Sequence, residues 1–459
     1  MGLIRSVSGV RGIVGSDITD ETAALYGRAF GGLVGGRVGV GRDSRRGGER
    51  LAAALRRGLA EAGAEPADLG VLPTPTIGIA TRLHGLSGAV AVTASHNPEE
   101  WNGFKFFSSR GVFLTREEVG RVFGRADGGV GIATHAPSAG VALSGSADEH
   151  AELVVSSEFV DRASVERAGL RVVVDCVNAA GSFVVPPVLR ELGCSVVPLF
   201  CDAGRPFPHG AEPVAANLAA LAEAVVREGA AVGLACDPDA DRLAIVDERG
   251  RAVGEEYTLA VAVDTVLAVR KGPVVANVST SLMVDDIARA HGVPCHRTPV
   301  GEINVVARML EEGAVVGGEG NGGVILPAVH PGRDAATAAA LVLTAVSHAA
   351  GMSVSGLVSR LPAYAMHKSK VTAAVSSQRA LAEAMAEAFP GAAADLTDGA
   401  KMCWPDRWVH ARMSGTEPVV RIIAEARARA DAEQLVRRGE EVVSRLSEGA
   451  GPCAASSGS

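Results

Sequence analysis

Short apolar runs that break into polar loops and then into helices recur along this chain, and they constrain its fold most. The run 37–40 is followed by a loop and then by residues 47–63, where leucines recur at every fourth position, the spacing of one helix face. The runs 171–176 and 273–278 lead into comparable loops and helices. Each unit therefore reads as strand, loop and helix, which predicts mixed sheets covered by helices.

A second kind of break follows each of these units further along the chain. There an apolar run ends in a loop that is polar, acidic or rich in glycine, at residues 93–105, 237–242 and 317–323. We therefore predict an α/β fold with three similar α/β domains in tandem, each contributing one loop to a shared place. The expected domains cover residues 1–147, 148–252 and 253–362.

The pattern changes towards the C-terminus. A strand over 369–375 and a helix over 377–389 precede further strands, and the charged segment 430–447 reads as a final helix. These elements predict a smaller α+β domain over residues 363–448. The tail 449–459 is rich in Gly, Ser and Ala, and we expect it to be disordered.

The composition argues against several classes of function. The chain has 459 residues, which suggests roughly three or four domains. Its 44 basic and 52 acidic residues give a formal net charge of −8, which argues against nucleic acid or an anionic membrane as partner. No apolar run approaches the roughly 18 residues of a membrane span. The seven cysteines form no Cys-x-x-Cys motif, which favours free thiols in the cytoplasm.

Ser95 stands where a buried strand is expected to break into a loop. The apolar run 88–92 leads into Thr93-Ala-Ser-His-Asn-Pro98, a cluster typical of turns. A serine at such a break is held by a rigid scaffold, as a nucleophile or a phosphate carrier requires. The same residues also fit a surface turn with a capping serine, and the short pattern alone does not separate these two interpretations.

Three carboxylates alternate in a second loop, at Asp237, Asp239 and Asp241, between two apolar runs. Held this close, they repel one another unless a hard cation or protons compensate. A metal site is therefore the favoured interpretation, and a solvated acidic turn is the alternative. A calcium-binding EF-hand is excluded, because its sixth position requires glycine and Arg242 stands there, and because its flanks are helices rather than strands.

Arginines mark two further stretches. Residues 412–421, Arg-Met-Ser-Gly-Thr-Glu-Pro-Val-Val-Arg, offer two guanidinium groups, two hydroxyls and a glycine, which together suit a phosphate clamp. A polar hairpin is the alternative. The cluster 5–13 contains Arg5 and Arg11 and by itself is typical of an exposed loop. The glycine-rich stretch 317–323 likewise fits a plain hairpin.

Taken together, these stretches closely resemble the motifs of the α-D-phosphohexomutases, which move a phosphoryl group between C1 and C6 of a hexose. The matching segments are Ser8-Gly-Val-Arg-Gly12, Thr93-Ala-Ser-His-Asn-Pro98 with Asn102-Gly-Phe-Lys105, Asp237-Pro-Asp-Ala-Asp-Arg242 and Arg412-Met-Ser-Gly-Thr-Glu-Pro418. The resemblance extends over most of the chain and implies the fold that the strand and helix pattern predicts.

The resemblance also implies how the reacting site is built. Ser95 would carry the phosphoryl group as a phosphoserine. One Mg²⁺ ion would be held by a phosphate oxygen on Ser95 and by the three aspartates Asp237, Asp239 and Asp241. A hexose 1,6-bisphosphate would form within the site and would also serve as activator.

The remaining motif residues are expected to surround the substrate. Those implied to assist proton transfer or to steady the transferring phosphate are Lys105, Arg11, His96 and Arg242. Those implied to bind the sugar or the phosphate that is not reacting are Glu319, Asn321, Arg412, Ser414, Gly415, Thr416 and Arg421.

One stretch departs from the family pattern. The family carries Gly-Glu-x-Ser-Gly-His in its sugar loop, and here Asn321 replaces the serine and Gly323 replaces the histidine. His330 follows seven residues on, but the sequence does not show whether it reaches the site. The altered loop, followed by Arg333-Asp334, resembles a divergent branch of the family that is often read as phosphoglucosamine mutases or as bifunctional glucose and mannose enzymes.

We therefore expect an isomerase of the phosphohexomutase class acting on glucosamine 6-phosphate, with glucose or mannose phosphate as the alternative. Two other classes compete. A metal-dependent sugar phosphatase would use the acidic loop but would not need a second phosphate clamp, and a non-catalytic sugar-phosphate sensor would not need Ser95. The expected partner is a small hexose phosphate rather than nucleic acid or membrane, for a cytoplasmic monomer or homodimer.

Overall fold

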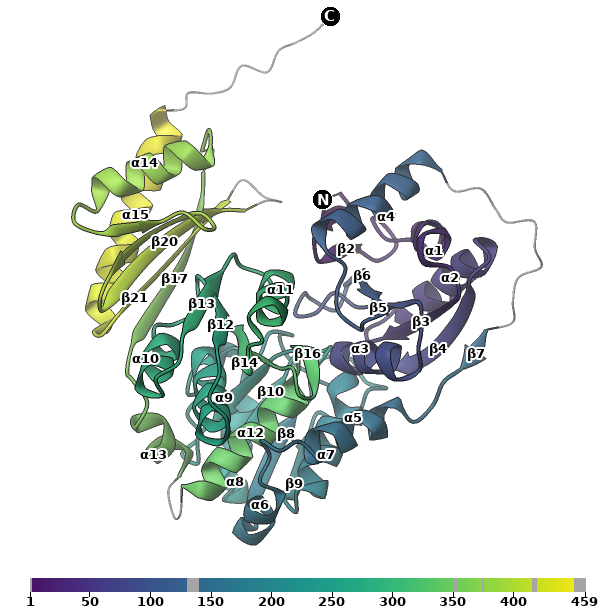
Figure 1. The fold of residues 1–459 in the computed structure, drawn as a ribbon, viewed down its shortest axis with the longest axis horizontal. Helices are drawn as coiled ribbons and strands as arrows, with labels where there is room; N and C mark the ends of the chain where they lie inside the picture. Colours follow the sequence, from purple (N-terminus) through teal and green to yellow (C-terminus); the bar gives the residue numbers. More distant parts are fainter. Residues whose placement is uncertain (1, 130–139, 350–352, 374, 415–418, 450–459) are drawn as a thin grey trace, which may run out of the picture.

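The computed structural model describes residues 2–129, 140–349, 353–373, 375–414 and 419–449. Four β-sheets follow one another along the chain, and the fourth, at the upper left of Figure 1, lies across from the first, at the upper right. The first three sheets are mixed and carry helices, whereas the fourth is antiparallel. The expected architecture of three α/β domains and a smaller C-terminal α+β domain is confirmed.

The first sheet belongs to the part of the chain that contains Ser95. Its elements are β1 (Ile4–Ser6), β2 (Gly9–Ile13), α1 (Asp20–Val34), β3 (Arg37–Arg42), α2 (Gly48–Glu61), β4 (Glu65–Val71), α3 (Thr74–Leu83), β5 (Gly88–Val92), β6 (Trp101–Ser108), α4 (Arg116–Gly128) and β7 (Val141–Ala142). The strand order is β1-β2-β6-β5-β3-β4-β7. Strands β4 and β5 run parallel to β3, and β6 runs antiparallel to β5.

The N-terminal hairpin corrects one expectation. The cluster 5–13, expected as an exposed loop, contributes to β1 and β2, and Arg11 pairs with Gly103 of β6. Gly9 adopts a φ of 105° in the turn, and a Cβ there would lie 2.0 Å from the carbonyl oxygen of Phe104. The glycines that suggested a loop thus permit close strand pairing. The hairpin places Arg11 beside the strand that follows the Ser95 loop.

The second and third sheets repeat the central order of the first. The elements around the second are α5 (Ser146–Val155), α6 (Arg162–Ala168), β8 (Arg171–Asp175), α7 (Val185–Glu191), β9 (Ser195–Leu199), α8 (Ala219–Glu228), β10 (Val232–Cys236) and β11 (Leu243–Val246), with short 3₁₀ turns at Ala180–Phe183 and Ala215–Asn217. Those around the third are α9 (Glu255–Val269), β12 (Val274–Asn277), α10 (Met283–Ala290), β13 (Cys295–Thr298), α11 (Glu302–Glu312), β14 (Val316–Glu319), β15 (Gly323–Leu326), β16 (His330–Arg333), α12 (Ala335–His348) and α13 (Val354–Ser359). The orders β11-β10-β8-β9 and β15-β14-β12-β13 both match β6-β5-β3-β4.

The three predicted loops leave their sheets at equivalent places. In each sheet the loop joins a parallel strand to its antiparallel neighbour. The β5–β6 loop contains Ser95, the β10–β11 loop contains the three aspartates, and the β14–β15 turn contains Asn321. Ligand sites in such sheets form at the carboxyl ends of the parallel strands, so the repeated topology directs three different chemistries to one region.

The second and third sheets share one hydrophobic core. A continuous cluster of buried side chains extends from Ala151 to Val354, whereas the first and fourth sheets have cores of their own. Helix α12 packs against α6, α7 and α9, and thereby joins the two parts. Its first turn is capped by Asp334, whose carboxylate accepts hydrogen bonds from the backbone N–H groups of Ala336 and Thr337.

In the fourth sheet and its helices, two elements have other bounds than the sequence predicted, namely the first strand and the last helix. Its elements are β17 (Ala365–Thr372), α14 (Gln378–Ala388), β18 (Ala393–Asp395), β19 (Ala400–Trp404), β20 (Arg407–Met413), β21 (Val419–Ala426) and α15 (Arg429–Gly449), in the strand order β17-β21-β20-β19-β18. The strand expected at 369–375 begins and ends earlier, because its whole length pairs with β21. Helix α15 includes Gly449, and the rest of the expected tail lies outside the described residues. Within the described ranges, no helix is long and apolar enough to cross a membrane.

Candidate active site

A cavity of about 1010 Å³ is lined by residues from all four parts of the chain. The lining includes eight of the residues predicted from the sequence, namely Arg11, His96, Lys105, Arg242, Glu319, Asn321, Arg412 and Arg421. Ser95 and the three aspartates are at most 1% exposed. They lie beneath the cavity wall, where they contact the lining residues His96, Lys105 and Arg242. Ser414 is described but is not part of the lining, and Gly415 and Thr416 lie outside the described residues.

Ser95 has a backbone conformation that is unusual for serine. Its φ is 52°, in the left-handed region, and its backbone N–H donates to the Oγ1 atom of Thr93. The Oγ atom lies 3.2 Å from Oδ2 of Asp237 and 3.4 Å from Nδ1 of His96. The loop therefore directs the hydroxyl of Ser95 at the acidic loop of the second sheet.

A buried ion pair that sequence reasoning missed holds this loop. Arg45 Nε donates to Oδ2 of Asp43 at 2.7 Å, and both side chains are fully buried. The guanidinium also donates to the carbonyl oxygens of Ser95, at 2.5 Å, and of Trp101, at 2.8 Å. Asp43 Oδ2 in turn accepts from the hydroxyl of Thr93. The available signal was the polar loop 41–45, which follows the first apolar run at the same edge of the sheet.

The acidic loop is shaped by its own backbone. Oδ1 of Asp237 accepts the N–H groups of Asp241 and Arg242, both at 3.1 Å, and Ala240 has a φ of 50°. These bonds close a tight turn between β10 and β11. The first part of the chain reinforces it, because the hydroxyl of Thr74 donates to Oδ2 of Asp239 at 2.6 Å. Thr74 is a second residue that the motif pattern did not indicate.

The three aspartates fit a metal ion. Their carboxylate atoms lie within 4.8 Å of one another. Asp239 and Asp241 each accept hydrogen bonds through Oδ2, and within the described part of the chain their buried Oδ1 atoms accept none. Oδ2 of Asp237 faces the hydroxyl of Ser95. Unpartnered buried carboxylate oxygens are costly unless a cation compensates, and an all-oxygen set suits a hard divalent cation.

Fixed cations already offset part of this negative charge. Nζ of Lys105 lies 2.7 Å from Oδ2 of Asp239 and 3.4 Å from Oδ2 of Asp241. Burial lowers the pKa of Lys105, but the two carboxylates outweigh burial and raise it. Burial and the neighbouring carboxylates raise the pKa of Asp237 well above its usual value. Burial also raises the pKa of Asp241, but Arg333, Lys105 and Arg242 outweigh it and lower that pKa.

The sugar-loop carboxylate Glu319 is held from two sides. Its Oε1 atom accepts from Nδ2 of Asn277 at 2.7 Å and from the N–H of Gly301 at 2.9 Å. Its Oε2 atom accepts from Arg333 at 2.6 Å. Asn321 lines the cavity and caps the turn, because its Oδ1 accepts from the N–H of Gly323.

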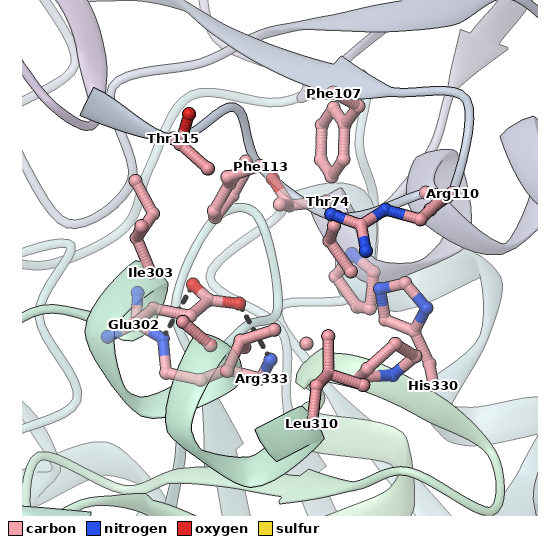
Figure 2. A pocket seen from close by; sticks show the side chains of 17 residues that line it. Thr74, Phe107, Arg110, Phe113, Thr115, Glu302, Ile303, Leu310, His330 and Arg333 are labelled. Atoms are coloured by element: carbon pink, nitrogen blue, oxygen red, sulfur yellow. Dashed lines mark hydrogen bonds and ion pairs between the residues drawn. The ribbon is translucent and has the colours of Figure 1, made fainter. Parts of the chain in front are cut away.

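His330 does not reach the cavity. It is 2% exposed and lines a separate pocket of about 50 Å³ between the first and third sheets (Figure 2). Burial lowers its pKa to about 3. His330 therefore does not replace the histidine that is absent at position 323.

Three cations stand in one row on the fourth sheet. Lys370 of β17 lies directly opposite Arg421 of β21, which lies opposite Arg412 of β20. Residues directly opposite each other share a face of the sheet, and all three line the cavity. The sequence motif indicated the two arginines, whereas only the strand register shows that Lys370 lies beside them. The row suits a phosphate dianion.

Arg11 and His96 complete the wall near Ser95. Arg11 donates to Oδ1 of Asn97 at 3.0 Å, which connects the N-terminal hairpin to the Ser95 loop. Burial, together with Arg242 and Arg11, strongly lowers the pKa of His96. These surroundings favour the neutral form of the His96 imidazole.

Comparison with known proteins accounts for this arrangement. Profiles of one family, described as "Phosphoglucomutase/phosphomannomutase", match residues 3–127 as alpha/beta/alpha domain I, 148–250 as domain II, 254–364 as domain III and 368–441 as the C-terminal domain. The chain belongs to this family. Its members are phosphohexomutases, which are isomerases, so the expected enzyme class is confirmed.

Relatives of this phosphohexomutase match it over nearly its whole length. A "Probable phosphoglucosamine mutase" of Methanopyrus kandleri is 37% identical over 456 residues, which cover 98% of this chain and 99% of the relative. A "Phosphoglucomutase/phosphomannomutase" of Thermococcus kodakarensis is 36% identical over 462 residues, which cover 98% and 100%. The crystal structure of a phosphoglucomutase/phosphomannomutase family protein from Burkholderia thailandensis matches with a TM-score of 0.83 and 26% identity, over 96% of this chain and 98% of that one.

Proposed function

We propose that this phosphohexomutase moves a phosphoryl group between C6 and C1 of glucosamine phosphate, converting glucosamine 6-phosphate to glucosamine 1-phosphate. The observation that carries the proposal is the contact between the hydroxyl of Ser95 and Asp237, behind a cavity that also contains the row of three cations. A phosphate carrier, a site for a divalent cation and a second phosphate site are the three parts that such a transfer needs.

The proposed reaction has two phosphoryl transfers. In the first, a hexose hydroxyl oxygen attacks the phosphorus of phosphorylated Ser95, and the bond from that phosphorus to Oγ breaks, which gives a hexose 1,6-bisphosphate. In the second, Oγ attacks the other phosphorus, whose bond to the sugar oxygen breaks, and the phosphoserine is restored. The proton released in one transfer is returned in the other, and Lys105 and Arg11, which both line the cavity, would assist its transfer.

The metal in this proposal is one Mg²⁺ ion per chain. Asp237, Asp239 and Asp241, with a phosphate oxygen on Ser95, would hold it. When bound, it would offset the charge that develops on the transferring phosphoryl group. His96 lies next to Ser95, and Arg242 lies next to Asp241, so both would steady the transferring phosphoryl group from the side of the cavity.

The second phosphate is assigned to the cation row at Lys370, Arg412 and Arg421, together with Ser414, Gly415 and Thr416 of the adjoining motif. The row would bind a phosphate through its charge and would not select for the sugar between the two phosphates. It therefore suits an intermediate that presents either of its two ends to Ser95, which is why a bisphosphate is proposed both as intermediate and as activator.

The choice of glucosamine rests on the acidic side chains in the cavity. Five glutamates line it, namely Glu212, Glu255, Glu256, Glu302 and Glu319. Within the described residues, four of them form ion pairs with the protein and Glu256 does not. Burial disfavours the charged form of Glu256 and raises its pKa to about 8, and an ammonium group of the substrate would stabilise the carboxylate by pairing with it. The name of the Methanopyrus kandleri relative points to the same sugar, and that of the Thermococcus kodakarensis relative supports glucose or mannose phosphate as the alternative.

The deciding measurement is turnover with MgCl₂ and a trace of glucose 1,6-bisphosphate. Glucosamine 6-phosphate, glucose 1-phosphate and mannose 1-phosphate are compared, with Ser95→Ala as the control. Fastest isomerisation of the amino sugar, with a preference that Glu256→Gln reduces, supports the proposal. Faster isomerisation of glucose or mannose phosphate identifies the alternative substrate.

Two other outcomes would reject a mutase altogether. Release of inorganic phosphate without isomerisation would indicate a phosphatase, and binding without turnover would indicate a sugar-phosphate sensor.

A cytoplasmic location and a monomeric or homodimeric state remain predictions. Light scattering of the purified protein tests the oligomeric state directly.

A further inference from the structure

We propose that Arg333 is a positioning residue with two roles: it fixes the orientation of Glu319 towards the sugar, and it supplies a permanent positive charge to the metal loop at Asp241. This inference rests on the proposed function, because it assigns Glu319 to the sugar and Asp241 to the metal. Arg333 ends the short strand β16, and the sequence motifs assign it no role.

The guanidinium of Arg333 bridges the second and third sheets. Its NH1 group donates to Oε2 of Glu319 at 2.6 Å, and its NH2 group donates to Oδ2 of Asp241, also at 2.6 Å. Arg333 is 9% exposed, so both ion pairs are shielded from water. A planar guanidinium with two fixed partners locks their relative positions, which a flexible ammonium does not do.

Arg333 completes the set of donors around Glu319. Asn277 and Gly301 hold only the Oε1 atom, and Arg333 is the group that donates to Oε2. With all three donors in place, the carboxylate has one orientation in a cavity wall. Without Arg333, the carboxylate is free to rotate about its own axis, and a ligand must then order it on binding.

The carboxylate of Glu302 fixes Arg333 on the side away from Glu319 and Asp241. Oε1 of Glu302 accepts the backbone N–H of Arg333 at 2.9 Å, and Oε2 forms an ion pair with Nε at 3.2 Å. Figure 2 shows both carboxylate oxygens of Glu302 directed at Arg333, on the side that faces the small pocket. Glu302 therefore aims the two terminal nitrogens of the guanidinium at Glu319 and Asp241.

The glycine at position 323 is matched to this arginine. A Cβ at Gly323 would lie 2.2 Å from Cδ and 3.0 Å from Cγ of Arg333. A histidine, or any other side chain, at this position is therefore incompatible with Arg333 in its present place. The departure from the family pattern at Gly323 and the arginine ten residues later form one structural unit.

The two roles predict opposite changes when Arg333 is replaced by methionine. The loss of the positive charge beside Asp241 makes the metal loop more negative, so Mg²⁺ should bind at least about threefold more tightly. The loss of the donor to Glu319 loosens the sugar loop, so glucosamine 6-phosphate should bind about tenfold more weakly. A purely structural role would weaken both, because a damaged site binds neither ligand well.

The experiment measures both affinities by isothermal titration calorimetry of the full chain, with MgCl₂ alone and with glucosamine 6-phosphate, in a Ser95→Ala background that prevents turnover. Opposite changes for Arg333→Met support the proposal, and parallel changes or none overturn it. Arg308→Met serves as the control, since Arg308 forms exposed ion pairs with Glu311 and Glu312 on α11.

Arg333→Lys separates the two roles and is less disruptive to folding. Lysine keeps the charge but loses the two-pronged geometry, so the affinity for Mg²⁺ should stay within about twofold of the parent while that for the sugar phosphate falls. An unchanged sugar-phosphate affinity would contradict the proposal. Failure of the proposed function has a different signature. The chain with Ser95 intact would then bind glucosamine 6-phosphate without isomerising it, or would not bind it at all.

Discussion

The hydroxyl of Ser95 lies 3.2 Å from Oδ2 of Asp237, although 142 positions separate the two residues in the chain. Both side chains are buried, so the contact is formed within the protein and not across open solvent. It joins the loop of the first sheet to the loop of the second. The proposed phosphate carrier and the proposed metal loop are thus in direct contact in the folded chain.

Replacing either partner of this contact should abolish isomerisation. For Ser95→Ala and for Asp237→Asn we expect kcat to fall at least about a thousandfold, because one removes the phosphate carrier and the other a metal ligand. A coupled assay measures the rate, and circular dichroism checks the fold. Ser156→Ala, at the exposed end of α5, should retain the parental rate. A Ser95→Ala variant with substantial turnover would exclude a phosphoserine mechanism.

Removal of the divalent cation should reversibly stop the reaction. Treatment with EDTA is expected to eliminate turnover, and MgCl₂ to restore it. MgCl₂ should also raise the melting temperature, because the ion binds the folded site and compensates its buried carboxylates. Asp241→Asn should reduce this thermal shift. If the melting temperature of the parent does not respond to MgCl₂, the three aspartates are not a magnesium site.

Arg45 should be important for stability as well as for activity. Arg45→Met leaves Asp43 as an uncompensated buried charge, and we expect it to lower the free energy of unfolding by about 3–5 kcal/mol. The neighbouring Arg46 provides a matched control, since its side chain is 79% exposed in its ion pair with Glu99. Arg46→Met should cost less than about 1 kcal/mol. Denaturant titration distinguishes these results, and equal effects would refute the assigned role of Arg45.

Lys370 should contribute to phosphate binding. Lys370→Ala is expected to raise KM for the hexose phosphate about tenfold with a smaller effect on kcat, because one of three aligned cations is lost. The salt dependence of KM should weaken at the same time. Lys271→Ala, which removes an exposed cation elsewhere, should change neither quantity. An unaltered KM for Lys370→Ala would place the second phosphate away from this row.

Glu256 should make stability depend on pH. Burial raises its pKa from 4.5 to about 8, so between these values the folded protein retains a proton that the unfolded chain releases. The free energy of unfolding must therefore fall as pH rises through this window. Glu256→Gln removes this contribution, and the melting temperature of the variant should rise relative to the parent from pH 5 to pH 8. A constant difference would show that Glu256 is already ionised in the folded state.

The sequence allowed prediction of the loops because each depends on local chemistry. The alternating aspartates, the Ser95 turn and the clamp motif are short segments whose residue types indicate their chemistry directly. The three similar domains followed from the recurrence of apolar runs and loops. The structure confirmed this architecture and brought Arg11, Arg242 and Arg421 to one cavity.

The residues that hold these loops could not be predicted in the same way. Arg45 acts on the carbonyl group of Ser95, and Arg333 acts on Asp241, 92 positions away. Such contacts depend on how sheets pack, which local patterns do not encode. The N-terminal hairpin was missed for a related reason, since its glycine-rich composition is typical of a loop and its strand character comes from pairing with β6.

The turn between β14 and β15 has a consequence for how substrate preference can diverge. Its strands keep a regular antiparallel register, with Glu319 opposite Gly323, although the loop residues depart from the family pattern. The backbone hydrogen bonds of the strands carry the fold, so a residue of the turn can change when the side chain packed against it changes too, as Gly323 and Arg333 illustrate. If this turn contacts the sugar as proposed, the accepted sugar can change through a few tip residues and their buried counterpart, while the loops at Ser95 and at the three aspartates remain as they are.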